Sequence, residues 1–262
     1  MNGNRQITCL RAAAFAVVGG FLLLAAGPSL AAGDTKAPNS PGFSFQGPFG
    51  TFDRGELQRG FQVYQEVCSS CHAIKYLAFR NLLRIGFSEE QVKAIAAQYE
   101  VTDGPDAEGE MFQRPARLSD HVPSPFANDN AARFANNGAL PPDLSLIVKA
   151  RTGGENYLYS LLTGYENPSS DVELGEGMSY NAYFPGHQIA MPPPLFEDGV
   201  EYADGKAAST NQMARDVTTF LTWVAEPDLE TRKGMGIKVM IFLILLTALL
   251  YMVKRKVWRD VH

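Results

Sequence analysis

The residues with the clearest chemical signature lie together at Cys68-Ser69-Ser70-Cys71-His72. This C-x-x-C-H spacing is the attachment signal of c-type haem. Two thiols at this spacing can add to the two vinyl groups of one porphyrin, and the histidine that follows can bind its iron. The motif therefore predicts one covalently bound haem c, attached through Cys68 and Cys71, with His72 as the first axial ligand.

Two other chemistries use paired cysteines. A thioredoxin-type dithiol requires a βαβ unit around the motif, and the sequence shows no such pattern. A structural zinc site usually draws four ligands from two cysteine pairs. The third cysteine, Cys9, lies in the N-terminal leader, so the exported chain has no second pair. Haem attachment is the favoured interpretation.

The residues alone do not decide the second axial ligand. Met191 precedes three prolines at 192–194, whose fixed φ would stiffen a loop that holds a ligand. His187 would instead give a bis-histidine site of lower potential. Met213 lies on the apolar face of a predicted helix, where a methionine usually fills the core. The remaining candidates are Met111, Met178 and His121.

A predicted helix leads into the motif and must position it. Asp53 and Glu56 have the spacing of a capping box, which indicates a helix that starts at Asp53. The apolar residues that follow at helical spacing place Cys68 on the same face. These residues are Leu57, Phe61 and Tyr64.

The rest of the chain reads as short helices joined by long loops. The fold class is therefore mainly α: a c-type cytochrome domain whose long loops surround one haem. Residues 101–142 and 165–210 are predicted as loops, the second with a few short strands. The predicted helices cover 74–85 before Gly86, a segment capped by Ser88 and Gln91, 144–148 before Gly153, 157–162 before Gly164, and 213–224 before Pro227.

The two ends of the chain carry the most apolar segments. Residues 12–26 follow two arginines and precede small residues, which predicts a secretory signal peptide over 1–31. Residues 234–253 would span about 30 Å as a helix, the thickness of a bilayer core. The basic residues at 254–256 place the C-terminus in the cytoplasm. The predicted division is a signal peptide (1–31), a periplasmic cytochrome c domain (32–231), a transmembrane anchor (232–257) and a cytoplasmic tail (258–262).

The exported part is strongly acidic. Residues 32–231 contain 27 Asp and Glu against 14 Lys and Arg, a net charge of −13. This charge excludes nucleic acid as a natural partner and favours a basic soluble partner, which an acidic surface can steer. The stretch 100–110 contains five acids and no base.

Several segments outside the motif form an ordered set that, with the C-terminal anchor, resembles the cytochrome c1 family. Members of this family are the haem subunits of cytochrome bc1 complexes, and the likeness is to the bacterial type. Three of the segments read RGFQVY at 59–64, ANNGALPPDLS at 135–145 and YFPG at 183–186. The others are 103–105, 109–112, 160–165, 219–223 and 225–227.

The resemblance implies roles for single residues. Met191 matches the family's methionine ligand, so that His72 and Met191 would bind the iron. Arg151 matches an arginine beside a haem propionate, whose charge it would neutralise. Pro141 and Pro142 match residues packed near the haem. The extra disulfide of some bacterial relatives has no cysteines here, so we expect packing alone to hold the loop before Met191.

The resemblance also implies a function. The chain would take one electron from the Rieske iron–sulfur protein and pass it to a soluble c-type cytochrome, as a non-catalytic subunit of quinol–cytochrome c reductase. Cytochrome b would be its membrane partner, in a dimeric complex of the bacterial inner membrane. One alternative is an anchored cytochrome that works alone between a quinol enzyme and an oxidase. A haem sensor or enzyme with an open sixth position is another.

Overall fold

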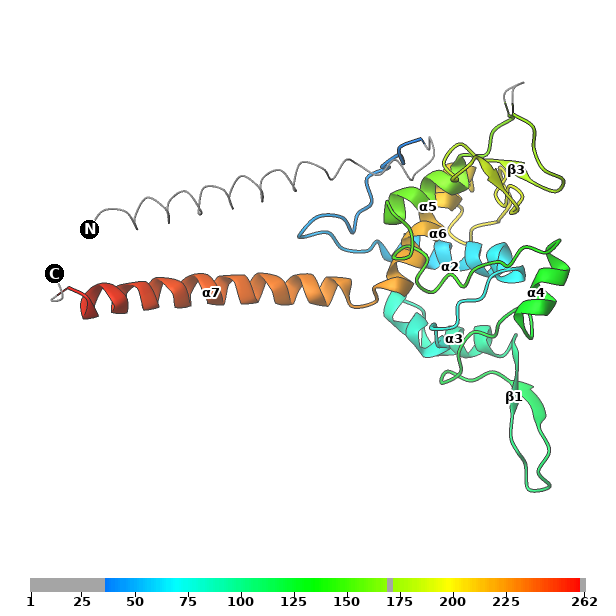
Figure 1. The fold of residues 1–262 in the computed structure, drawn as a ribbon. Coiled ribbons are helices and arrows are strands. Elements are labelled where there is room, and N and C mark those ends of the chain that lie inside the picture. The colour runs from blue at the N-terminus through cyan, green and yellow to red at the C-terminus, as the bar shows by residue number, and fades with distance from the viewer. Residues whose placement is uncertain (1–35, 169–171, 260–262) are drawn as a thin grey trace, which may run out of the picture.

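The computed structural model describes residues 36–168 and 172–259, and it shows a mainly helical domain from which one long helix extends (Figure 1). The predicted signal peptide and residues 260–262 of the predicted tail lie outside the described residues. In chain order the elements are α2 (Arg54–Glu66), the 3-10 helices η1 (Cys68–Ser70) and η2 (Phe79–Ile85), α3 (Glu89–Ala96), β1 (Glu100–Asp103), β2 (Phe112–Pro115), α4 (Asp129–Ala135), α5 (Gly154–Thr163), β3 (Ser179–Tyr180), β4 (Gln188–Ile189), α6 (Thr210–Ala225) and α7 (Leu229–Val257).

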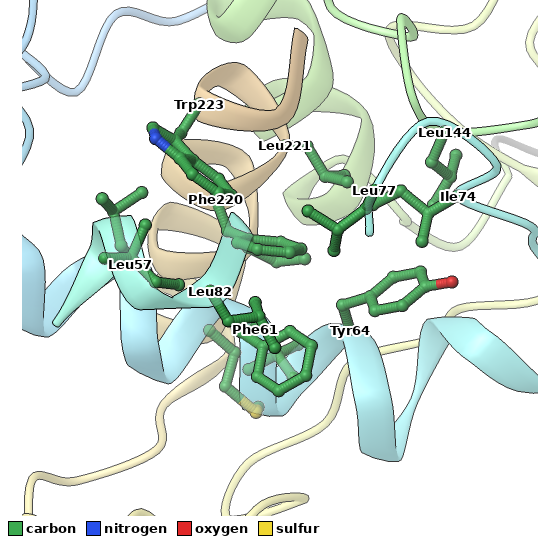
Figure 2. Packing of buried hydrophobic residues seen from close by; sticks show 14 of the residues in the cluster. Leu57, Phe61, Tyr64, Ile74, Leu77, Leu82, Leu144, Phe220, Leu221 and Trp223 are labelled. Carbon is green, nitrogen blue, oxygen red and sulfur yellow. The ribbon is translucent and has the colours of Figure 1, made fainter. Parts of the chain in front are cut away.

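The domain is built around the contact between α2 and α6. At Gly60 the helices approach so closely that a Cβ atom would lie 2.1 Å from the carbonyl oxygen of Asp216. Figure 2 shows Phe61 and Tyr64 of α2 facing Phe220 of α6, with ring centroids 5.6 and 6.0 Å from that of Phe220. All three rings are buried. Glycine at this position therefore allows the aromatic core to close.

A buried ion pair reinforces the same contact. Arg59 of α2 donates from Nε to Asp216 of α6 at 2.9 Å, and the Asp216 side chain is completely buried. The Arg59 guanidinium also pairs with Asp204 at 2.7 Å and lies 5.7 Å from the ring centre of Tyr202. The pair thus fastens the loop before α6 to the helix that leads into the haem motif.

The structure confirms that two predicted helices begin at polar capping residues. The Asp53 side chain accepts a hydrogen bond from the Glu56 amide at the start of α2, and Ser88 and Gln91 form a capping box at the start of α3. Gly164 follows α5, and α6 covers the predicted amphipathic segment. Met213 of α6 is fully buried, as expected of core packing.

Two predicted helices differ from the structure: the one that ends before Gly86 is shorter than predicted, and the one at 144–148 is absent. Within 74–85 only η2 is helical. The Val122 amide donates to the Leu77 carbonyl, and the Phe79 amide donates to the Asp120 carbonyl. Residues 144–148 form consecutive turns instead of a helix, and the Leu144 amide donates to the Ala73 carbonyl at 2.8 Å. In the first segment, pairing with residues 120–122 replaces the first predicted helical turns. The Leu144 bond does not explain the second difference, because the first amide of a helix has no partner within the helix.

The region 101–142, predicted as a loop, contains a hairpin and a short helix. Strands β1 and β2 pair antiparallel with Val101 opposite Arg114, and the hairpin projects from the domain (Figure 1). Arg114 pairs with Asp103 and, at 2.6 Å, with Asp120. Its hydrogen bond lowers the pKa of Asp120 to about 2. Most acids of the stretch 100–110 are thereby displayed on an extended arm.

The last element agrees with the predicted anchor. Among the described residues, α7 is the single helix whose length and composition suit a membrane span. It begins at Leu229, three residues before the predicted anchor, and extends away from the domain (Figure 1).

Replacing Gly60 tests the helix contact. We expect Gly60→Ala to lower the free energy of unfolding by about 1–3 kcal/mol, since the added methyl meets fixed backbone. Gly55→Ala in the same helix is the control, because its Cβ would approach only the side-chain ends of Arg59 and Asp53 at 3.2 Å. Urea titrations of the haem-loaded chain measure both. Equal effects of the two substitutions would contradict the role given to Gly60.

Candidate haem site

The motif at residues 68–72 follows the end of α2 and includes η1. The amides of Cys71 and His72 both bond the Cys68 carbonyl, at 3.2 and 2.9 Å, which winds the five residues into a tight turn. Tyr64, one helical turn before Cys68, donates its hydroxyl to the His72 carbonyl at 3.2 Å. The helix end therefore fixes the backbone of the histidine.

Both cysteines of the motif are free and partly exposed. Burial raises the pKa of the Cys68 thiol to about 12, and the neighbouring Cys71 adds to the shift. Cys68 is therefore a neutral thiol at physiological pH. The two sulfurs are not joined to each other, so both can form thioether bonds.

A backbone carbonyl sets the orientation of His72. The imidazole Nδ1 lies 2.8 Å from the Pro142 carbonyl oxygen. A carbonyl only accepts, so the proton is assigned to Nδ1 and the lone pair to Nε2. Burial lowers the pKa of His72. This effect outweighs the hydrogen bond to the Pro142 carbonyl and the charge of Asp143, which both raise the pKa. A neutral imidazole held by its other nitrogen is the form that binds metals.

The loop that supplies this carbonyl is itself pinned to the motif segment. Asp143 accepts from the amides of Lys75 and Ser145 at 3.2 and 2.7 Å. The Ser145 hydroxyl accepts from the Tyr76 amide at 3.1 Å. The loop that begins at Pro142 thus runs along the residues that follow His72.

A cavity of about 600 Å³ opens beside the motif, and Cys71, Pro141 and Pro142 contribute to its wall. The structure therefore brings both predicted prolines to the motif. The donors fit haem c, since they comprise two free thiols and an imidazole with an available Nε2 beside a proline-lined cavity.

Met191 lies on a separate segment. Its carbonyl accepts from the Tyr165 hydroxyl at 3.1 Å, and Tyr165 forms a β-bridge with Asn181. The Asn181 amide donates to the His187 carbonyl at 2.9 Å, and the Gln188 side chain accepts from the Gly175 amide. Hydrogen bonds as well as packing hold this loop, which corrects the expectation of packing alone.

The other candidate ligands differ in environment. Met111 is 59% exposed on the hairpin, and Met178 is half-buried near Gly175. His121 bonds the Lys75 carbonyl through Nδ1. The His187 ring stacks on Tyr180, and its buried Nδ1 has no hydrogen-bond partner among the described residues. The role of Met191 as an iron ligand stays a prediction.

Arg151 is exposed at the end of the turns that follow Val148. Its guanidinium donates to the Ala150 carbonyl at 3.1 Å and forms no ion pair with a carboxylate within 36–168 and 172–259. No carboxylate of the described residues therefore neutralises this cation. Its predicted role beside a propionate stays a prediction.

Metal-binding clusters of another kind are absent from the part of the chain that the structure describes. No three or more His, Cys, Asp and Glu side chains gather there as a possible metal site.

Two residues of the site escaped the sequence reasoning. Asp143 accepts from the amide two residues on, and this spacing is a recognisable Asx turn. The contact of Tyr165 with Met191 crosses 26 residues of irregular chain, and no local pattern signals it.

Comparison with known proteins places the similarity across the whole domain. The sequence matches the model of the Cytochrome C1 family over residues 43–261. Cytochrome c1 of Rhodospirillum rubrum is 50% identical over 262 residues, which cover 91% of this chain and 96% of that protein. The mitochondrial cytochrome c1 heme protein of Saccharomyces cerevisiae is 50% identical over 220 residues, 84% of this chain and 71% of that protein.

A further relative is a longer protein. Cytochrome b/c1 of Bradyrhizobium diazoefficiens is 48% identical over 252 residues, which cover 88% of this chain and 36% of that protein. The chain thus corresponds to about a third of this relative.

Removing the Asp143 carboxylate tests the support of His72. We expect Asp143→Ala to lower the free energy of unfolding by about 1–3 kcal/mol, because two amides lose a charged acceptor. Asp129→Ala is the control, since Asp129 lines the same cavity from an exposed position, and we expect a change within about 0.5 kcal/mol. Urea titration followed by circular dichroism measures both, and equal losses would contradict the role of Asp143.

Proposed function

The chain belongs to the cytochrome c1 family, and on this premise we propose that it carries one electron at a time within a cytochrome bc1 complex. The family supports the role of haem subunit in that complex and implies a haem c cofactor. The electron comes from the Rieske iron–sulfur protein and leaves to a soluble c-type cytochrome. The chain is thus a redox subunit of the quinol–cytochrome c reductase, and it transforms no substrate of its own.

The contact of His72 with the Pro142 carbonyl carries this proposal. A bound haem c supplies reversible one-electron chemistry at its iron. Cys68 and Cys71 would hold one such group through thioether bonds, and His72 would offer Nε2 to the metal. The Pro142 carbonyl holds the ring in that tautomer, which also raises the basicity of Nε2.

Two further residues tune the site. Met191 would supply a thioether to the iron, and histidine–methionine ligation would raise the reduction potential. Arg151 lies without a carboxylate partner among the described residues, and it would neutralise a propionate. A high potential suits a group that must accept electrons from a Rieske centre.

The partners follow from the family and from charge. The name of the longer relative, Cytochrome b/c1, supports cytochrome b as the membrane partner. Two copies of the complex form a dimer. A net charge of −13 over 32–231 suits a basic soluble acceptor that docks through weak, salt-sensitive contacts.

The predicted topology is retained in the proposal. A signal peptide over 1–31 exports the chain, and α7 crosses the bacterial inner membrane. The basic residues at 254–256 keep the C-terminus in the cytoplasm, so that the haem domain faces the periplasm.

Co-purification tests the assignment to the complex. We expect the chain, extracted in mild detergent, to bring cytochrome b with it and to show the spectra of both b-type and c-type haem. The c-type haem should stay with the polypeptide in acid acetone, since thioether bonds hold it. A pigment-bearing chain that purifies without cytochrome b would instead be a stand-alone cytochrome.

Methionine variants identify the second ligand. We expect Met191→Ala to lower the reduction potential by on the order of 0.1 V or more, because axial ligands set haem potentials over a range of about 0.8 V. The reduced variant should also bind carbon monoxide, unlike the parent protein. Met178→Ala is the matched control from the same long loop and should change neither property. If Met178→Ala has these effects and Met191→Ala does not, the assignment is wrong.

A further inference from the structure

The loop 46–50 displays one phenylalanine from a segment that buries its others. Phe43, Phe45 and Phe52 are between 3% and 5% exposed, and their rings pack in series with centroids 5.1 and 4.9 Å apart. Phe49 is 78% exposed. Since the three buried rings fix the segment on both sides, the exposure of Phe49 does not come from a loose chain.

Helix α7 holds both ends of this loop. Lys233 donates its ammonium to the carbonyls of Phe45 and Gly50, the second at 3.2 Å. One turn earlier, Glu230 accepts from the Phe52 amide at 2.8 Å and pairs with Arg54 at 2.7 Å. The position of Phe49 along the axis of α7 is therefore set by two charged residues of that helix.

The apolar part of α7 fixes where the bilayer begins. Residues 234–253 match a hydrocarbon core of about 30 Å, so its edge lies near residue 234. The headgroup layer adds roughly 5–7 Å on each side, which corresponds to three to five helical residues. Glu230 and Lys233 lie within that layer. The loop that they hold projects from the domain on the side from which α7 leaves (Figure 1).

We propose that the loop 46–50 is a second membrane contact, in which Phe49 inserts into the periplasmic leaflet of the phospholipid bilayer beside α7. This inference rests on the proposed function, because it requires α7 to span the membrane. The loop reads Gln-Gly-Pro-Phe-Gly and contains no charge that would have to leave water. The helix and the loop together hold the haem domain in one orientation on the membrane.

Spin labels on single cysteines test the contact. In the haem-loaded mature chain Cys68 and Cys71 are occupied, so a new cysteine is labelled alone. Phe49→Cys, Phe134→Cys and Ile244→Cys are each labelled and reconstituted, with co-purified partners, into phospholipid nanodiscs. Phe134 on α4 is 94% exposed and serves as the aqueous reference, and Ile244 on α7 is 62% exposed and serves as the lipid reference.

Collisions with oxygen, which concentrates in lipid, and with a water-soluble nickel chelate are then compared. We expect the label at 49 to favour oxygen, with nickel accessibility several-fold below that at 134. A label at 49 that behaves like the one at 134 overturns the inference. Exclusion of both reagents also overturns it, because Phe49 would then lie against a protein partner. If the label at 244 fails to favour oxygen, the membrane span of the proposed function falls together with the inference.

Discussion

The close approach of α2 and α6 at Gly60 constrains the rest of the structure. Helix α2 ends in the haem motif, and α6 leads into α7, so one helix contact sets the motif relative to the membrane anchor. The buried Arg59–Asp216 pair and the rings of Phe61 and Phe220 hold this contact from two sides. A buried ion pair is itself weak evidence for stability. The backbone proximity that only glycine permits is the stronger constraint.

The candidate site is assembled from segments that are far apart in sequence. The end of α2 supplies the thiols and the imidazole, and the loop after Pro141 supplies the carbonyl that orients the imidazole. The segment of Met191 is anchored elsewhere, through Tyr165. The two parts are joined by α2, since Arg59 pairs with Asp204 and Gln62 donates to the Glu201 carbonyl at 2.8 Å, both in the loop that follows Met191. The chain contributes orientation and electrostatics, and the prosthetic group contributes the redox chemistry.

The sequence predicts those features whose cause is local. The helix starts at Asp53 and Ser88 follow from side chains that bond their own backbone, and the cysteine spacing follows from the geometry of one porphyrin. A prediction fails where a distant segment binds the backbone, as where the Val122 amide bonds the Leu77 carbonyl. The β1–β2 hairpin was missed because its strands are short, polar and exposed, so they carry no alternation of apolar residues.

The connection between α6 and α7 is very short. Three residues, 226–228, separate the two helices, and the first of them, Glu226, is bound by Lys149 from the loop before α5 and by Arg232 from α7. So short a connection provides no flexible linker about which the domain could rotate relative to α7. The orientation of the domain is therefore coupled directly to that of α7, and a tilt of the helix would tilt the domain with it.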